Sequence, residues 1–290
     1  MRTLSRTGTV LALAFLPLPL VLGIGGDPGP AGSGLEAQEP PRPGRPTREE
    51  SQDLRLRMPP DDEPPGRHAF YWTRAVYNGV SRGGWWGRGS PTWATDFPKG
   101  DRQFLVVLQR LVQLDAYDFE NAVGLADPRL RRFPLIYAVE VGYMDLTEAE
   151  VQGLRGYLEA GGMLLVDDFW GEREWANFQY NMSRVLPGRP IVEIPRDHPL
   201  FSVYYDIEEI KQVPARGRGI GGRPTWERRD ARTPHVRGIF DEEGRLMVVI
   251  NFNTDLGDAW EWAEDPYYPL EYSTFAYEMG ANMIVYGMSH

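Results

Sequence analysis

Hydrophobic and polar residues between positions 135 and 166 follow the pattern of a strand, a helix and a second strand. The segments 135–141 and 163–166 are apolar without alternation, which is typical of strands covered on both faces. Between them, apolar residues recur at helical spacing, with polar residues on the opposite side. The apolar positions are Val151, Leu154, Tyr157 and Leu158. This succession predicts a βαβ unit and hence a parallel sheet.

The residues at both ends of this helix suit helix termini. Thr147 and Glu150 have the spacing of a capping box, in which the two side chains accept backbone hydrogen bonds reciprocally. Gly161 and Gly162 predict the C-terminal end, because glycine adopts the left-handed conformation at low cost.

Similar patterns occur through the rest of the chain up to residue 290. Further strands are expected at 68–76, 117–119, 191–194 and 246–252. Further helices are expected at 101–114, 172–186 and 273–286. The expected fold class is therefore α/β, with a mainly parallel open sheet and helices on both faces in a three-layer sandwich.

The first 66 residues differ in composition from the rest of the chain. Arg2 and Arg6 precede an apolar stretch at 10–24, which predicts a removable export signal over 1–37. Residues 38–66 are rich in proline, arginine and acids, which predicts a disordered linker before a single α/β domain at 67–290. We expect a periplasmic or extracellular protein, with an uncleaved N-terminal anchor as the alternative.

Charge and cysteine content exclude several classes of function. The net charge is −10, whereas a nucleic-acid binder needs a basic face. The absence of cysteine excludes disulfides, thiolate nucleophiles and cysteine-ligated zinc. The four histidines lack paired ligand spacing, so we expect no zinc site, and we assign no cofactor or metal. Beyond residue 24, no stretch is long and apolar enough to span a membrane.

The first candidate site is the acidic pair Asp167 and Asp168, which follows the strand at 163–166 and precedes Trp170. Open α/β sheets bind ligands at the carboxyl ends of their strands. Consecutive strand residues point to opposite faces, so the two carboxylates are expected to act separately. One would face a cleft and bind a ligand or a metal ion, while the other would cap the helix that begins near Glu172. Capping or solubility alone would explain these acids equally well.

A second candidate site follows the strand at 246–252. Its residues are Asn251, Asn253, Asp255, Asp258, Trp260 and Glu261. The three acids are spaced by three residues, so in a helical turn they would share one face and could hold a hard cation. The alternative is a helix N-terminus whose acids suit the helix dipole. If this group and Asp168 are neighbours, the two strand ends form one cleft.

The third candidate is a glycine-rich loop at 77–98 that contains tryptophans and arginines. Trp85, Trp86, Trp93 and Arg88, together with Arg74 of the preceding strand, could stack on sugar rings or bind anionic groups. The alternative is a loop that buries its tryptophans, because exposed tryptophan is uncommon without a partner.

Four stretches of the chain resemble a bacterial family of uncharacterised exported or membrane-linked proteins, the domain of unknown function four-one-five-nine. They are 70–77, 146–171, DHPLFSVYYDI, and NFNTDLGDAWEW running on to YEMGANMIVYGMSH. The resemblance implies a flavodoxin-like fold of the class I glutamine amidotransferase type. It also implies partners in envelope assemblies that contain AAA-type ATPases and von Willebrand factor A-like proteins.

The residue types at the expected site argue against amidotransferase chemistry. In glutamine amidotransferases a nucleophilic cysteine follows the strand equivalent to 163–166, whereas this chain has Asp168 and Phe169 there and no histidine placed as a base. We favour a non-catalytic binding domain of the cell envelope, for a small polar or glycan-like ligand or a protein partner. The alternatives are a carboxylate-dependent hydrolase, metal-assisted or acting on glycans, and a purely structural subunit.

Overall fold

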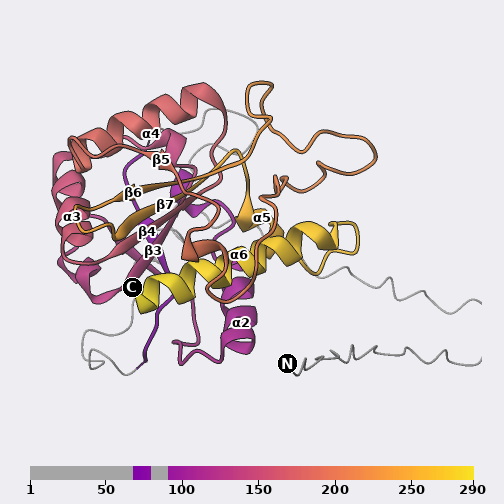
Figure 1. Ribbon diagram of the computed structural model, residues 1–290, viewed down its shortest axis with the longest axis horizontal. Coiled ribbons are helices and arrows are strands. Elements are labelled where there is room, and N and C mark those ends of the chain that lie inside the picture. The colour runs from indigo at the N-terminus through magenta and orange to yellow at the C-terminus, as the bar shows by residue number, and fades with distance from the viewer. Residues whose placement is uncertain (1–67, 80–90) are drawn as a thin grey trace, which may run out of the picture. The chain divides into compact units, whose positions relative to one another are not determined.

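The computed structural model describes residues 68–79 and 91–290, which form a seven-stranded sheet between two layers of helices (Figure 1). The strands are β1 (Thr73–Val76), β2 (Asn121–Gly124), β3 (Leu135–Val139), β4 (Met163–Asp167), β5 (Val192–Glu193), β6 (His235–Phe240) and β7 (Leu246–Phe252). Their order in the sheet is β2-β1-β3-β4-β7-β6-β5. The first five in this order are parallel, and β6 and β5 are each antiparallel to the strand before them. The expected α/β class is confirmed.

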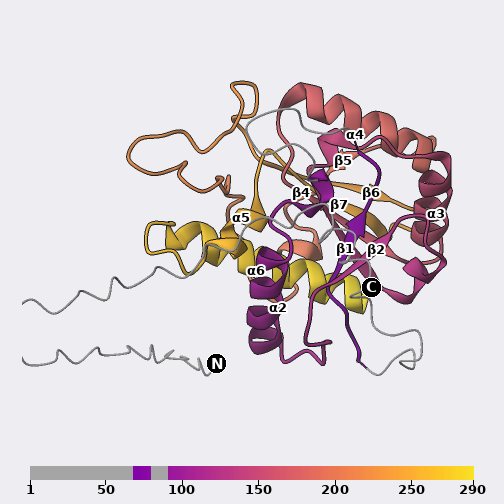
Figure 2. The same cartoon turned by 180° about the vertical axis from the view of Figure 1, so that it is seen from behind.

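Helices cover both faces of the sheet, as seen from the two sides in Figures 1 and 2. They are α2 (Lys99–Val112), α3 (Glu148–Glu159), α4 (Gly171–Val185), α5 (Leu256–Glu261) and α6 (Leu270–Ser289). Alternate residues of β3 divide between the two cores: Ile136 packs with α3 and α4, and Leu135 packs with α2, α5 and α6. Each fully buried aliphatic side chain contributes about 1.5–3 kcal/mol. The segments that the sequence predicts as strands covered on both faces, β3 and β4, are buried at every position, and so is β7.

The parallel strands define the edge at which a ligand would bind. Their order β2-β1-β3-β4-β7 corresponds to the order 2-1-3-4-5 of flavodoxin-like sheets. In such sheets ligands bind outside the carboxyl ends of the strands. In this chain the ends of β3, β4 and β7 meet at that edge, because the three strands are parallel neighbours.

Two strands differ from the sequence prediction. The prediction of a strand at 117–119 is wrong, because β2 lies at Asn121–Gly124 instead. Tyr117 stacks on Tyr71 with ring centroids 5.5 Å apart, and Phe119 is 54% exposed. The strand β6 is not expected from its sequence, HVRGIF, because arginine and glycine interrupt its apolar residues. Pairing with the fully buried β7 stabilises it.

The capping box of α3 is confirmed. Thr147 Oγ1 accepts a hydrogen bond from Glu150 N at 3.3 Å, and Glu150 Oε2 accepts one from Thr147 N at 2.8 Å. Gly161 follows the helix with φ of 106°. The four apolar positions that the sequence assigns to the inner face of this helix are all buried.

Two glycines of α3 allow a matched test of packing. A Cβ added at Gly153 would lie 2.0 Å from the backbone oxygen of Leu125, whereas one at Gly156 would lie 2.7 Å from Nη2 of the flexible Arg131. Alanine is about 1 kcal/mol better than glycine inside a helix, but overpacking against backbone costs about 1–3 kcal/mol. We expect Gly153→Ala to destabilise the protein in urea denaturation and Gly156→Ala to stabilise it slightly. Equal stability of the two variants would contradict this packing.

Several sequence predictions fall outside the described residues. The export signal at 1–37, the linker at 38–66, and Trp85, Trp86 and Arg88 of the glycine-rich loop remain predictions. Across the described residues, no helix combines the length and the apolar character needed to cross a membrane.

Candidate functional site

Polar residues with a left-handed backbone follow three of the parallel strands. Glu140, Asp168 and Asn253 come directly after β3, β4 and β7, with φ of 54°, 51° and 60°. Asp96, in the segment that leads into α2, has φ of 61°. Non-glycine residues in this conformation cost of order 1–3 kcal/mol and cluster at functional sites.

Five carboxylates converge at this edge of the sheet, and we call them the acidic group. They belong to Asp96, Asp168, Asp255, Asp258 and Glu261. In Asp96, Asp168 and Asp255, one carboxylate oxygen of each residue lies within 4.8 Å of the corresponding oxygens of the other two. The same holds for Asp96, Asp258 and Glu261. Asp168 and Asp255 are only 5% and 3% exposed. The acidic ends of β4 and β7 therefore share one site.

The buried carboxylates of this group repel one another. Burial, followed by the charges of Glu140 and Glu227, raises the pKa of Asp168 well above its ordinary value. Burial, followed by the charge of Asp168, raises the pKa of Asp255 in the same way. Within the described part of the chain, neither Asp168 nor Asp255 forms an ion pair with lysine or arginine. A cation held by their oxygens would relieve this repulsion.

Glycine at position 257 brings the start of α5 close to these oxygens. A Cβ there would lie 2.8 Å from Asp96 Oδ2, 3.3 Å from Tyr137 Oη and 3.5 Å from Asp255 Oδ1. Asp255 is the N-cap of α5, since its Oδ1 accepts a hydrogen bond from Asp258 N at 2.8 Å. Asp255 therefore both caps a helix and belongs to the acidic group, so the two interpretations of this residue are compatible.

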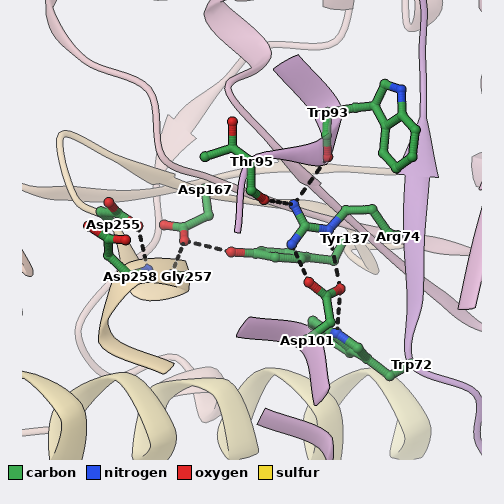
Figure 3. Close-up of polar contacts among 10 residues, drawn as sticks. All are labelled: Trp72, Arg74, Trp93, Thr95, Asp101, Tyr137, Asp167, Asp255, Gly257 and Asp258. Atoms are coloured by element: carbon green, nitrogen blue, oxygen red, sulfur yellow. Dashed lines mark hydrogen bonds and ion pairs between the residues drawn. The ribbon is translucent and has the colours of Figure 1, made fainter. Parts of the chain in front are cut away.

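Asp167 holds the start of α5, and its carboxylate lies between Tyr137 and the side of Asp255 and Asp258 (Figure 3). Its Oδ2 accepts hydrogen bonds from Tyr137 Oη at 2.8 Å, Leu256 N at 2.8 Å and Gly257 N at 3.1 Å. Its Oδ1 is buried and has no hydrogen-bond partner among the described residues. Asp167 and Asp168 have different hydrogen-bond partners, since Asp168 accepts from Trp170 Nε1.

The expectation that one of these two aspartates caps the helix near Glu172 is wrong. Other side chains accept the N–H groups at the start of α4: Glu174 Oε2, in the first turn of the helix, accepts from Trp170 N at 2.6 Å, and Asn253 Oδ1 accepts from Gly171 N at 2.9 Å. Asn251 donates to the backbone oxygen of Val166 at 3.1 Å. Both asparagines therefore join the ends of β4 and β7 and hold the site in place.

Arg74 lies in a buried ion pair and does not join the acidic group (Figure 3). Its Nη2 and Nε donate to the carboxylate of Asp101, and Nη1 donates to the backbone oxygens of Trp93 and Thr95 at 3.3 and 3.0 Å. Its guanidinium carbon lies 4.7 Å from the centre of the Tyr137 ring. The residue is 1% exposed, so its charge stabilises the interior beneath the site.

The predicted tryptophans lie in different places. Trp170 Nε1 donates to Asp168 Oδ1 at 3.0 Å and so orients one carboxylate of the acidic group. Trp260 is a core residue, with its ring centre 4.1 Å from that of Phe104. Trp93 is 4% exposed, which agrees with the alternative that the loop buries it.

Three acids at this edge were not predicted from the sequence. Asp96 stands in the glycine-rich loop at 77–98, whose sequence points to its tryptophans and arginines. Glu140 follows β3, and Glu227 stands in an arginine-rich segment. The signal that could have found Glu140 was its position directly after an apolar strand, the same position that drew attention to Asp167 and Asp168.

The raised pKa values predict an unusual dependence of stability on pH. Burial raises the pKa of Asp167 to about 7, although Tyr137 and the N–H of Gly257 oppose the shift, and burial raises the pKa of Asp258 to about 6. Both ordinary values are 3.8, so between pH 4 and 7 the folded protein binds protons that the unfolded chain has released. Stability should then fall as pH rises through this window.

Urea denaturation in a chelating buffer at pH 5 and at pH 7.5 measures this effect. We expect the cation-free protein to be more stable at pH 5. A rise in stability between pH 5 and 7.5 would contradict the described burial of these carboxylates.

Comparison with known proteins places the chain in a family. No curated protein matches it. A family model, described as a domain of unknown function (DUF4159), matches residues 82–288. The match includes α2, β7 and the whole acidic group, whereas the stretch at 70–77 lies outside it. The chain therefore belongs to the DUF4159 family, as its motifs predict.

Proposed function

We propose that this edge of the sheet binds a divalent cation and, through it, a small polar or glycan-like ligand. The observation that carries this proposal is the convergence of Asp96, Asp168 and Asp255, whose oxygens lie within 4.8 Å of one another at the carboxyl ends of parallel strands. Carboxylate oxygens are the ligands that Ca²⁺ and Mg²⁺ prefer. The protein is then a binding domain without a catalytic nucleophile.

Burial supports a cation rather than a solvated acidic surface. Ionised carboxylates that leave water need a partner, because an unpaired buried charge is costly. Asp168 and Asp255 are buried without a basic partner among the described residues, and one oxygen of the adjacent Asp167 is buried without a hydrogen bond. The Asp167 oxygen is an observation separate from the distances within the acidic group. It shows that this part of the molecule lacks hydrogen-bond donors for its buried carboxylates.

Thermal unfolding of the protein with and without Ca²⁺, Mg²⁺ and Mn²⁺ tests the proposal. A cation that binds only the folded state should stabilise it by about 2.7 kcal/mol at one hundred times its dissociation constant. Asp255→Asn should abolish the response, while Asp118→Asn, at an exposed acid remote in sequence, should keep it. An unfolding midpoint that no cation raises would end the proposal.

Metal-assisted hydrolysis is the second candidate function. It is favoured by the membership of Asp96 in both groups of carboxylates, since two adjacent cations that share a ligand are typical of hydrolases. Release of product from phosphate esters or glycans, dependent on added cation and lost in Asp255→Asn, would establish it. Binding of cation without any turnover would leave the binding domain as the function.

The place of the protein in the cell envelope is also a proposal. The signal-like composition of residues 1–37 supports it. The resemblance to envelope-associated proteins suggests AAA-type ATPases and von Willebrand factor A-like proteins as partners. Mass spectrometry of the protein recovered from its own cells would show a new N-terminus near residue 37 if the signal is removed.

A further inference from the structure

The segment 214–233, which we call the arginine loop, differs in charge from the rest of the molecule. It contains six arginines and two acids, a net charge of +4, in a chain whose total is −10. It leads into β6 and, with the start of α6, projects beyond the sheet at the same end of the molecule in both views (Figures 1 and 2). The fold therefore concentrates positive charge at one projecting place.

The base of the arginine loop is fixed to the domain. Arg216 N donates to Asp258 Oδ2 at 2.7 Å, and the Arg216 guanidinium forms an ion pair with Asp265 at 2.7 Å. A Cβ at Gly219 would lie 3.3 Å from Cε2 of Tyr272. These contacts place the loop against the first turn of α6, so the two form one surface.

Several arginines of this loop are not neutralised by acids. Glu227 pairs with Arg218, and Asp230 accepts a hydrogen bond from the N–H of Glu172 at the start of α4. Arg223 and Arg229 are exposed and form no ion pair with any carboxylate among the described residues. Their charges remain available to an anionic partner.

Exposed apolar residues stand in the arginine loop and at the start of α6. Ile220 in the loop is 36% exposed, and Tyr267 and Leu270 at the start of α6 are 81% and 77% exposed. Tyr267 N donates to Asp265 Oδ1 at 2.9 Å, which ties this turn to the carboxylate that pairs with Arg216. Tyr267 and Leu270 are by far the most exposed large apolar side chains in the described part of the chain.

We propose that the arginine loop and the start of α6 dock onto an anionic membrane surface. Arginines attract anionic lipid headgroups, and exposed tyrosine and leucine side chains enter the interface between headgroups and acyl chains. An acidic protein partner would use the arginines but would leave Tyr267 and Leu270 to find a separate apolar pocket. The rest of the chain has a net charge of −14, so its overall field repels such a membrane, whereas the arginine loop is attracted to it. The proposal does not depend on cation binding at the acidic group.

Sedimentation with vesicles tests this surface on the full chain. We expect binding to phosphatidylcholine vesicles that contain phosphatidylglycerol, weakened by salt, and none to phosphatidylcholine alone. Each arginine near an anionic surface is worth about fivefold in affinity, so the double variant Arg223→Ser, Arg229→Ser should bind about 30-fold more weakly. The matched control is Arg110→Ser, Arg131→Ser, which removes two exposed arginines outside the loop and should bind normally.

A second variant separates membrane docking from simple charge attraction. Tyr267→Ser, Leu270→Ser keeps every charge, and it should also weaken vesicle binding if these side chains enter the interface. Unfolding midpoints of the variants equal to that of the parent protein would show that the substitutions act at the surface. Equal losses in the loop variant and the control, unchanged binding of the Tyr267 and Leu270 variant, or binding to soluble polyglutamate but not to vesicles would each overturn the proposal.

Discussion

Replacing Arg74 with alanine is expected to lower the free energy of unfolding by about 3–5 kcal/mol, the range for breaking a buried ion pair by removing one partner. Arg74 and Asp101 are 1% and 0% exposed, and Trp72 Nε1 also donates to Asp101 at 2.9 Å. Burial already raises the pKa of Asp101 despite the opposing charge of Arg74. Without the guanidinium, this carboxylate is left in the interior with the indole N–H alone. Urea denaturation at pH 7.5 measures the loss.

The matched control is Arg129→Ala, which breaks a pair with Asp127 whose side chains are 37% and 23% exposed. Exposed pairs contribute about 0–1 kcal/mol, so this variant should be nearly as stable as the parent protein. Equal stability losses for the two arginines would mean that the interior described around Arg74 is wrong.

Replacing Asp168 with asparagine is expected to have opposite effects with and without cation. In cation-free protein at pH 7.5 the variant should be more stable, by about 1–3 kcal/mol, because it removes a buried carboxylate that has no basic partner among the described residues. With saturating Ca²⁺ the parent protein gains about 2.7 kcal/mol at one hundred times the dissociation constant, and the variant should gain nothing. Asparagine tolerates the left-handed backbone at this position and can still accept the hydrogen bond from Trp170 Nε1.

This reversal distinguishes a binding site from a structural contact. A carboxylate that only stabilised the fold would leave the variant less stable under both conditions. Asp118→Asn, at an exposed position, should change neither value by more than about 0.5 kcal/mol. Destabilisation of the cation-free Asp168→Asn protein would contradict the account of this site.

The elements with strong local signals were predictable from the sequence. The capping box at Thr147 and Glu150 and the uninterrupted apolar runs of β4 and β7 each occur at or within one residue of the predicted place. β2 and β6 were not predictable, because a short strand and a strand interrupted by arginine depend on pairing with neighbours far away in the sequence. The local sequence pattern therefore predicts the helices and the buried strands. The positions of β2 and β6 depend on their pairing with other strands.

The candidate site was predictable in part. Asp168 and Asp255 were identified from their positions after apolar strands, but their proximity depends on β4 and β7 being neighbours, which no local pattern reports. Asp96 reaches the same place from the segment before α2, far from either strand in sequence. Arg74 and Trp260 carry residue types suited to binding, yet both are buried in the interior because their partners Asp101 and Phe104 come from α2.

The most direct test of cation binding at the acidic group is luminescence of Tb³⁺, an oxygen-seeking ion that replaces Ca²⁺ in proteins. Trp170 Nε1 lies 3.0 Å from Asp168 Oδ1, so light absorbed by this indole should be transferred to an ion bound there. We predict emission that saturates in a single step, is displaced by Ca²⁺, and is lost in both Asp168→Asn and Asp255→Asn. Absence of sensitised emission from the parent protein, or emission that both variants retain, would contradict a cation site at the ends of β4 and β7.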